Sequence, residues 1–143
     1  MDAAVVGLGA MGSAALFHLA KRGLRVVGFD RFAPPHPHGS SHGRTRVIRQ
    51  AYYEHPDYVP LIRRAWELWQ ELGPSLLRRT GAYMIGLPDS EVVRGSAASA
   101  REHGLAHRML SMEELRREVP ALRPRAGEVA LHEEEAGVLF VEE

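Results

Sequence analysis

The first residues able to do chemistry are three glycines that follow the opening apolar run of the chain. Gly7, Gly9 and Gly12 come directly after Ala3–Val6, which predicts a short buried strand. In this spacing the first glycine allows a tight turn, the second lets a diphosphate approach the main chain, and the third lets a helix lie close to the strand. Free N–H groups at the start of that helix attract phosphate. The spacing therefore predicts a dinucleotide-binding turn.

A carboxylate follows the second predicted strand. Residues 25–29 predict that strand, and Asp30 stands at its carboxyl end, close to the ~20-residue offset at which an acid binds the adenosine ribose. The helix between the two strands is expected from Met11 to Arg22, closed by Gly23. Two neighbouring residues join the predicted cofactor contacts. They are Met11, which precedes Gly12, and Arg31, which follows Asp30.

A loop rich in proline, histidine, glycine and serine occupies residues 31–43. Its three histidines, at positions 36, 38 and 42, are expected to have no acidic partner near them, so we predict no metal site there. Residues 45–51 then predict an extended segment. Arg46 and Arg49 are expected on opposite faces of it, because their spacing is odd. Alternatively, Arg44, Arg46 and Arg49 are ordinary surface cations or form a patch for an anionic partner.

The remaining elements are expected to position these groups. Asp57 is predicted to cap a helix that ends at Leu72 and places Trp66 and Trp69 in the core. Alternating short strands and helices then predict an α+β layer, with a boundary near Arg79 that divides residues 1–79 from 80–143. The elements expected in this layer are a strand at 82–87, a helix at 90–103, a strand at 107–110, a helix opened by a Ser111/Glu114 capping box and stopped by Pro120, strands at 128–132 and 137–141, and a solvated turn at Glu133–Glu135.

The composition and charge of the chain limit the classes of function that it can have. The 143 residues are 45% hydrophobic and 25% charged, which is ordinary for a globular domain. The formal net charge of zero gives no bulk attraction to nucleic acid or to acidic membranes. No apolar run reaches the ~20 residues of a spanning helix, and no signal peptide is evident. Cysteine is absent, which excludes disulfides and thiolate metal sites within these residues. A cytoplasmic protein is the default expectation.

Several longer motifs together carry a family resemblance. They are Val5–Gly12, Phe29–Asp30, Pro34–His36, Gly39–Arg49, Tyr52, Tyr58–Pro60, Glu67–Trp69 and Gly137–Phe140. In these motifs the chain resembles the N-terminal part of the monomeric sarcosine oxidase and N-methyltryptophan oxidase family of flavoenzymes. The resemblance implies an α/β fold in which a Rossmann-like FAD-binding βαβ start (1–79) leads into the beginning of an α+β substrate domain (80–143), in a truncated chain.

The resemblance also implies an activity and site residues. Members of this family use FAD and oxygen to oxidise secondary amines, mostly N-methyl amino acids, to an imine and hydrogen peroxide. Arg46 would lie against one face of the flavin, and Arg49 would hold the substrate carboxylate with Tyr52 nearby. A guanidinium suits that carboxylate because it offers two parallel N–H donors. The other implied cofactor contacts are Gly7, Gly9 and Gly12 at the diphosphate, Asp30 at the ribose, and Ser40 and His42 close to FAD.

Two departures leave the substrate open. Ser41 stands where sarcosine oxidases commonly carry a second histidine, and Arg44 stands where they commonly carry an aspartate. The cysteine that links the flavin and the lysine that activates oxygen in this family would lie beyond residue 143. We therefore expect this chain alone to be inactive.

Two alternative functions remain at this point. The segment Gly7–Gly12 also resembles the start of NAD(P)-dependent β-hydroxyacid dehydrogenases, although no third βα unit follows it. The chain could also be a non-catalytic fragment or a subunit. Only two parallel strands are predicted, so self-association or a partner chain is expected to complete the fold.

Overall fold

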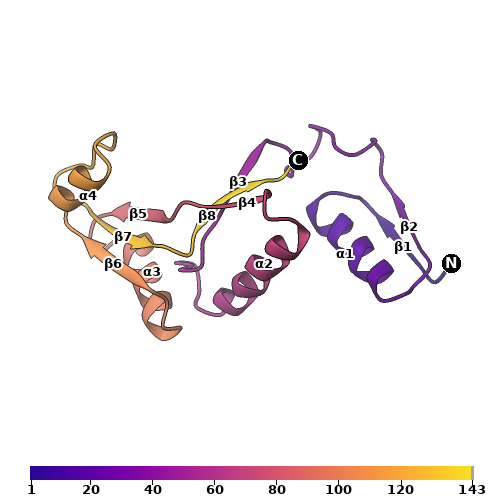
Figure 1. Ribbon diagram of the computed structural model, residues 1–143, viewed down its shortest axis with the longest axis horizontal. Helices are drawn as coiled ribbons and strands as arrows, with labels where there is room; N and C mark the ends of the chain where they lie inside the picture. The colour runs from indigo at the N-terminus through magenta and orange to yellow at the C-terminus, as the bar shows by residue number, and fades with distance from the viewer. Residues whose placement is uncertain (143) are drawn as a thin grey trace. The chain divides into compact units, whose positions relative to one another are not determined.

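A computed structural model describes residues 1–142 of the chain, which divide into two compact units (Figure 1). The first unit comprises Met1–Arg44 together with Glu142, and the second comprises Thr45–Val141. The compact units therefore separate upstream of Arg79, and the elements from residue 45 to residue 79 group with the later segment. The assignment of 1–79 and 80–143 to the two domains of a whole flavoenzyme stays a prediction.

The first unit is a βαβ unit. Strand β1 (Ala3–Val6) pairs in parallel with β2 (Val26–Phe29), and α1 (Ala10–Lys21) connects them. The helix lies close to β2 at Gly28, where a Cβ atom would come within 2.8 Å of the side chains of Leu8 and Leu16. These elements confirm the predicted strand–helix–strand start.

The two-stranded sheet of the first unit leaves apolar side chains uncovered. No residue of α1 is buried, and Val6 and Met11 are each 86% exposed. A parallel sheet ordinarily has both faces covered. The first unit therefore leaves large apolar side chains exposed.

One half of the second unit is a three-stranded antiparallel sheet in the order β3-β8-β4. Its strands are β3 (Thr45–Ile48), β4 (Leu77–Arg79) and β8 (Gly137–Phe140). Helix α2 (Tyr58–Leu72) packs on it through Trp66, which is buried with Ile48 and Leu139, while Trp69 is partly buried against the same cluster. The core role predicted for both tryptophans is confirmed. Strand β4 was not predicted.

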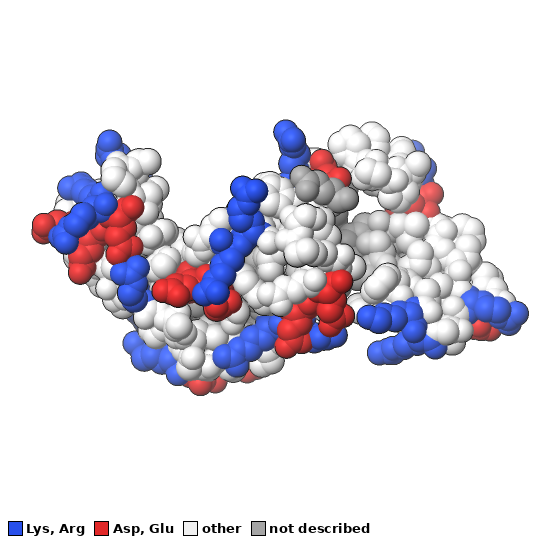
Figure 2. Space-filling model, viewed as in Figure 1, with Lys and Arg blue, Asp and Glu red and all other residues white. Residues whose placement is uncertain are grey.

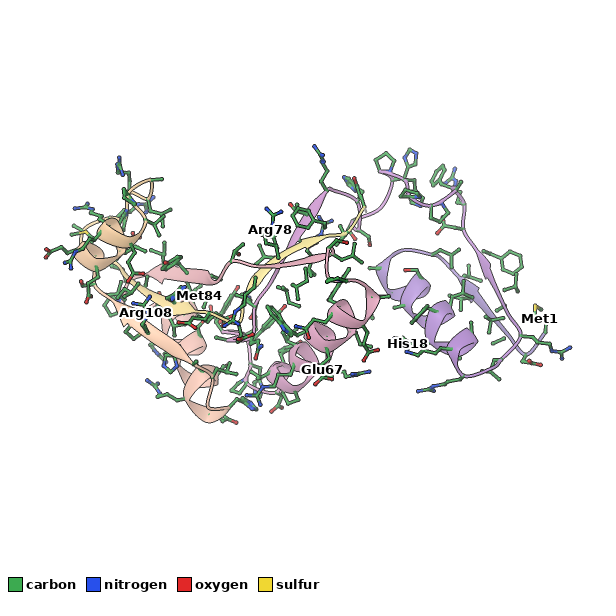
Figure 3. All side chains as sticks on the ribbon, in the orientation of Figure 1. Met1, His18, Glu67, Arg78, Met84 and Arg108 are labelled. Carbon is green, nitrogen blue, oxygen red and sulfur yellow. The ribbon has the colours of Figure 1, made fainter. Side chains whose placement is uncertain are left out.

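The other half is a second antiparallel sheet in the order β5-β7-β6. Its strands are β5 (Ala82–Gly86), β6 (His107–Leu110) and β7 (Val129–Glu133). Helix α3 (Glu91–Glu102) packs on it around Met84, which Figure 3 labels, and Leu131. Helix α4 (Met112–Glu118) buries Leu115 against the same sheet. Burial of a leucine side chain stabilises a fold by about 1.5–3 kcal/mol.

The helix starts of the second unit follow their sequence signals in two cases and depart from them in one. The Ser90 hydroxyl accepts the Val93 N–H, and Ser111 with Glu114 forms the predicted capping box. Asp57 is the N-cap of α2 but makes no side-chain cap hydrogen bond. Its backbone is already helical, with φ −61° and ψ −15°, whereas a capping side chain normally hangs from an extended residue.

Charges are mixed on the surface. On the face drawn in Figure 2, acidic and basic side chains lie interspersed over the second unit. The pair of Arg108 and Glu118 is one example, with Nη1 to Oε1 at 2.8 Å. Among residues 1–142, no helix is both long and apolar enough to cross a membrane.

Candidate functional site

The glycine turn of the first unit is shaped by two close approaches. Gly7 has φ +88°, in the left-handed region that favours glycine. A Cβ atom on Gly12 would lie 1.7 Å from the Gly7 carbonyl oxygen, so only glycine fits there. A Cβ atom on Gly9 would meet only the Ser41 Oγ atom, at 3.6 Å. Internal packing therefore explains why residue 12 is glycine. At Gly9 the main chain is uncovered, which suits the approach of a ligand.

The start of α1 presents N–H groups beside this turn. Gly9 is the N-cap residue and has no side chain to cap the helix. The Ser41 hydroxyl accepts the Ala10 N–H at 3.1 Å instead. In the sequence, Ser41 stands out only as a departure from the family pattern, and no local signal points across the 31 positions that separate it from Ala10. Met11 lies in the first turn, with its side chain exposed.

Asp30 is held beside the glycine turn as an ionised carboxylate. Its Oδ2 atom accepts the Leu8 N–H at 2.6 Å, and its Oδ1 atom accepts the Phe32 N–H at 3.1 Å. These backbone hydrogen bonds, that of Leu8 first, hold the pKa of Asp30 below its ordinary value. Each carboxylate oxygen retains a lone pair that can accept from a hydroxyl group. Asp30 therefore has the position and the charge expected of a ribose ligand.

The histidine loop packs around the same acid. His36 Nε2 lies 3.4 Å from Asp30 Oδ1, so the expectation that these histidines lack an acidic neighbour is wrong. The ring of Phe32 lies against the rings of His36 and His38, and the Arg31 guanidinium lies over Phe32. Within residues 1–142, no three His, Asp or Glu side chains group so as to hold a metal ion.

The two other predicted loop residues, Ser40 and His42, lie on the surface of the first unit. The ring of His42 is oriented by its Nδ1 atom, which bonds the Gly39 carbonyl oxygen at 2.5 Å. Gly43 N–H then donates to the Glu142 carboxylate at 2.7 Å, which ties the end of the loop to the far end of the described chain. The role of Ser40 and His42 at a cofactor stays a prediction.

The arginines of the second unit have different surroundings. Arg46 lies on β3 opposite Leu139 and donates from Nη1 to the Thr45 carbonyl oxygen at 2.8 Å. Arg49 follows β3, and its guanidinium lies 4.2 Å from the centre of the Tyr52 ring. Its Nη2 atom contacts Glu54 Oε1 at 3.0 Å. The Arg49 side chain is 20% exposed, so the structure has a partly buried cation that lies against a tyrosine ring and is paired with Glu54.

The position of Glu133 differs from the one predicted. It was expected in a solvated turn, yet it belongs to β7 and is 1% exposed. Its carboxylate accepts the N–H groups of Gln50 and Ala51, which come immediately after Arg49. Glu134 and Glu135 do lie outside the strands, and both pair with Arg79. Sequence reasoning missed Glu133 because three consecutive acids indicate a solvated segment.

The family follows from comparison with known proteins. The profile of the family described as DAO, FAD dependent oxidoreductase, matches residues 2–141. The chain belongs to this family. The predicted resemblance is confirmed, and the NAD(P)-dependent alternative is set aside because this family is defined by FAD.

Two curated relatives and one solved structure show how similar this chain is to known proteins. Monomeric sarcosine oxidase of Streptomyces avermitilis is 48% identical over 142 residues, covering 96% of this chain and 37% of that protein. N-methyl-L-tryptophan oxidase of Yersinia pestis is 34% identical over 142 residues, covering 96% and 38%. NikD, an unusual amino acid oxidase essential for nikkomycin biosynthesis, shares the fold with a TM-score of 0.83 at 23% identity, covering 99% and 38%. The chain thus spans a little over a third of the length of the relatives it matches.

Proposed function

We propose that this chain forms the FAD-binding start and part of the substrate-binding region of an oxidase that acts on secondary amines, in particular N-methyl amino acids. The relatives named above support the reaction class. The observation that carries the substrate class is Arg49, because a partly buried guanidinium flanked by a tyrosine ring suits the carboxylate of an amino acid. We therefore propose a small-molecule substrate. We also propose that the protein is cytoplasmic.

The first unit fits the adenosine diphosphate part of FAD. The glycine turn and the start of α1 would hold the diphosphate through backbone N–H groups, since Gly9 has no Cβ atom in the way. Asp30 would accept from the ribose hydroxyls with the lone pairs that its backbone hydrogen bonds leave free. Bound FAD would supply the redox chemistry, by taking two electrons from the amine and passing them to oxygen.

The second unit would orient the substrate. Arg49 would bind the carboxylate and fix the direction of the C–H bond to be oxidised, with Tyr52 packed against the guanidinium. We assign to Arg46 a fixed positive charge near the flavin, which would favour negative charge that develops during reduction. His42, in the first unit, is proposed as a further contact to FAD.

The exposed apolar side chains of the first unit lead to a proposal about assembly. Val6, Met11 and Phe29 would be covered either by chain that follows residue 143 or by a second polypeptide, which includes another copy of this one. We therefore expect these 143 residues alone to be inactive.

The test uses the complete protein, in which residues 1–143 are joined or bound to the polypeptide that covers the first unit. We expect the purified protein to be yellow, with flavin absorbance, and to form hydrogen peroxide from N-methyl amino acids. Arg49→Lys keeps the charge but loses the planar pair of donors, so kcat/KM falls about tenfold or more while FAD content is unchanged. Arg64→Lys is the matched control, because Arg64 is an exposed residue of α2 that pairs with Glu67. A colourless protein, or equal effects of the two substitutions, would contradict the proposal.

A further inference from the structure

The carboxylate of Glu133 is placed inside the second unit with a specific pair of partners. Glutamate is rarely fully buried unless its oxygens are satisfied. Here Oε1 accepts the Gln50 N–H and Oε2 accepts the Ala51 N–H, each at 2.6 Å. Both donors are buried as well, at 7% and 0% exposure. One side chain therefore satisfies two consecutive peptide groups more than 80 positions away in the sequence.

Those two peptide groups connect the residues proposed to meet the substrate. Gln50 and Ala51 lie between Arg49 and Tyr52. The Tyr52 N–H donates to the Gln50 carbonyl oxygen at 2.7 Å, which closes a tight turn. The Arg49 Nη1 atom donates to the Ala51 carbonyl oxygen at 3.3 Å. Arg49 and Tyr52 are thus the residues on either side of the two whose N–H groups Glu133 binds.

Helix α3 supports the next residues of this turn. The Ser99 hydroxyl donates to the Tyr52 carbonyl oxygen. Gly95 permits a close approach, because a Cβ atom there would lie 2.3 Å from the Tyr53 carbonyl oxygen. The turn is therefore held both by β7 and by α3.

A carboxylate is the side chain that suits this place. An apolar residue would leave two buried N–H groups without hydrogen-bond partners, which destabilises a fold. A glutamine could accept one N–H but would turn its own amide donors toward the other. Burial raises the pKa of Glu133, while the two N–H groups and the charge of Arg49 act in the opposite direction. The turn retains this carboxylate in spite of the cost of burying it.

We propose that Glu133 is a positioning residue, which sets the orientation of Arg49 and Tyr52 toward the substrate carboxylate by holding the Gln50 and Ala51 peptides. This inference rests on the proposed function, because it assumes that Arg49 binds that carboxylate. Glu133 itself has both oxygens engaged with the backbone and is closed to solvent, so its effect on substrate passes through the turn.

The experiment compares Glu133→Gln with Glu134→Gln in the FAD-loaded protein as its gene encodes it. Glu134 is the adjacent acid, and its carboxylate contacts Arg79 at the surface. We expect Glu133→Gln to raise KM for N-methylglycine about tenfold while kcat falls less than about threefold, because binding of the carboxylate depends on the direction of the guanidinium. Hydrogen exchange of the Gln50 and Ala51 amides should rise as well. Glu134→Gln should change neither.

The outcomes separate this inference from the function on which it rests. A wild-type protein that oxidises no N-methyl amino acid overturns the proposed function, and the inference with it. A wild type that is active, with KM in Glu133→Gln within twofold of it, overturns the inference alone. Should Glu133→Gln not accumulate as folded protein, Glu133→Asp and Ser99→Ala take its place, since each loosens the same turn. An unchanged KM in both of these would equally overturn the positioning role.

Discussion

The Nη2 atom of Arg49 lies 3.0 Å from one carboxylate oxygen of Glu54 and 3.2 Å from the other. The cation proposed to bind a substrate carboxylate therefore already holds a carboxylate of the protein. Glu54 is half exposed, with 40% of its side chain accessible, and follows Arg49 by only five positions. A substrate carboxylate that binds to Arg49 must share the guanidinium with Glu54 or displace it.

Glu54→Gln should therefore strengthen substrate binding. An exposed ion pair contributes about 0.2–1 kcal/mol, so removal of the competing charge should lower KM by a factor of about 1.4 to 5. Steady-state kinetics with an N-methyl amino acid measure this change. Glu67→Gln, which removes a surface partner of Arg64, should leave KM unchanged. A raised KM in Glu54→Gln would mean that Glu54 supports the substrate site.

Gly9 and Gly12 should respond differently to alanine. Gly12→Ala forces a Cβ atom to within 1.7 Å of the Gly7 carbonyl oxygen, so the turn must break, and overpacking of this kind costs about 1–3 kcal/mol or more. Gly9→Ala meets only Ser41 Oγ at an ordinary 3.6 Å. We expect Gly12→Ala to lower the thermal midpoint and Gly9→Ala to keep it while weakening FAD affinity. Calorimetry and flavin fluorescence titration separate the two effects, and equal midpoints would contradict this account.

Asp30 should make the stability depend on acid pH. Its pKa is lowered from the ordinary 3.8 in the folded protein, so its contribution is fully present above that value and is lost as the pH falls through the lower, folded pKa. Asp30→Asn should therefore destabilise the protein at about pH 5, and the difference from wild type should shrink toward about pH 3. Thermal midpoints across this range measure it. The exposed Asp89→Asn is the control, and a difference that grows at acid pH would refute the assignment.

Gly95→Ala should disturb the turn that carries Tyr52 and Tyr53. In an exposed helix this substitution ordinarily stabilises by up to about 1 kcal/mol. Here the added Cβ atom would lie 2.3 Å from the Tyr53 carbonyl oxygen, so α3 and the turn must move apart. We expect a lower thermal midpoint and a higher KM. Arg94→Ala, at an exposed position of the same helix, should leave KM unchanged; a stabilised Gly95→Ala with normal KM would show that the contact is dispensable.

Local signals were enough to predict most of the elements. The Gly7–Gly12 spacing and the Ser111/Glu114 box each specify structure within a few residues, and the structure has both. Strand β4 was missed because Leu77, Arg78 and Arg79 carry no strand pattern of their own. It is a strand because β8 pairs with it, and because the Arg78 side chain, labelled in Figure 3, lies over the Phe140 ring.

The candidate site was predictable only where its chemistry is local. Arg49 and Tyr52 stand close together in sequence, and the structure brings the guanidinium over the ring. The roles of Glu133 and Ser41 could not be predicted, because each binds backbone groups that are distant in sequence. A run of three glutamates predicts solvent exposure on average, and pairing of β7 with two neighbours buries the first of them.

The order of strands in the second unit has a consequence for synthesis on the ribosome. Strands β3, β4, β5 and β6 are all made first, and within the described chain each of them pairs only with β7 or β8, at residues 129–140. Four strands are therefore synthesised before the strands with which they pair. Both sheets can form only after residues 129–140 have been made. A nonsense codon before residue 129 would release a polypeptide with the edges of all four strands free, which is the form most prone to aggregate and to engage chaperones.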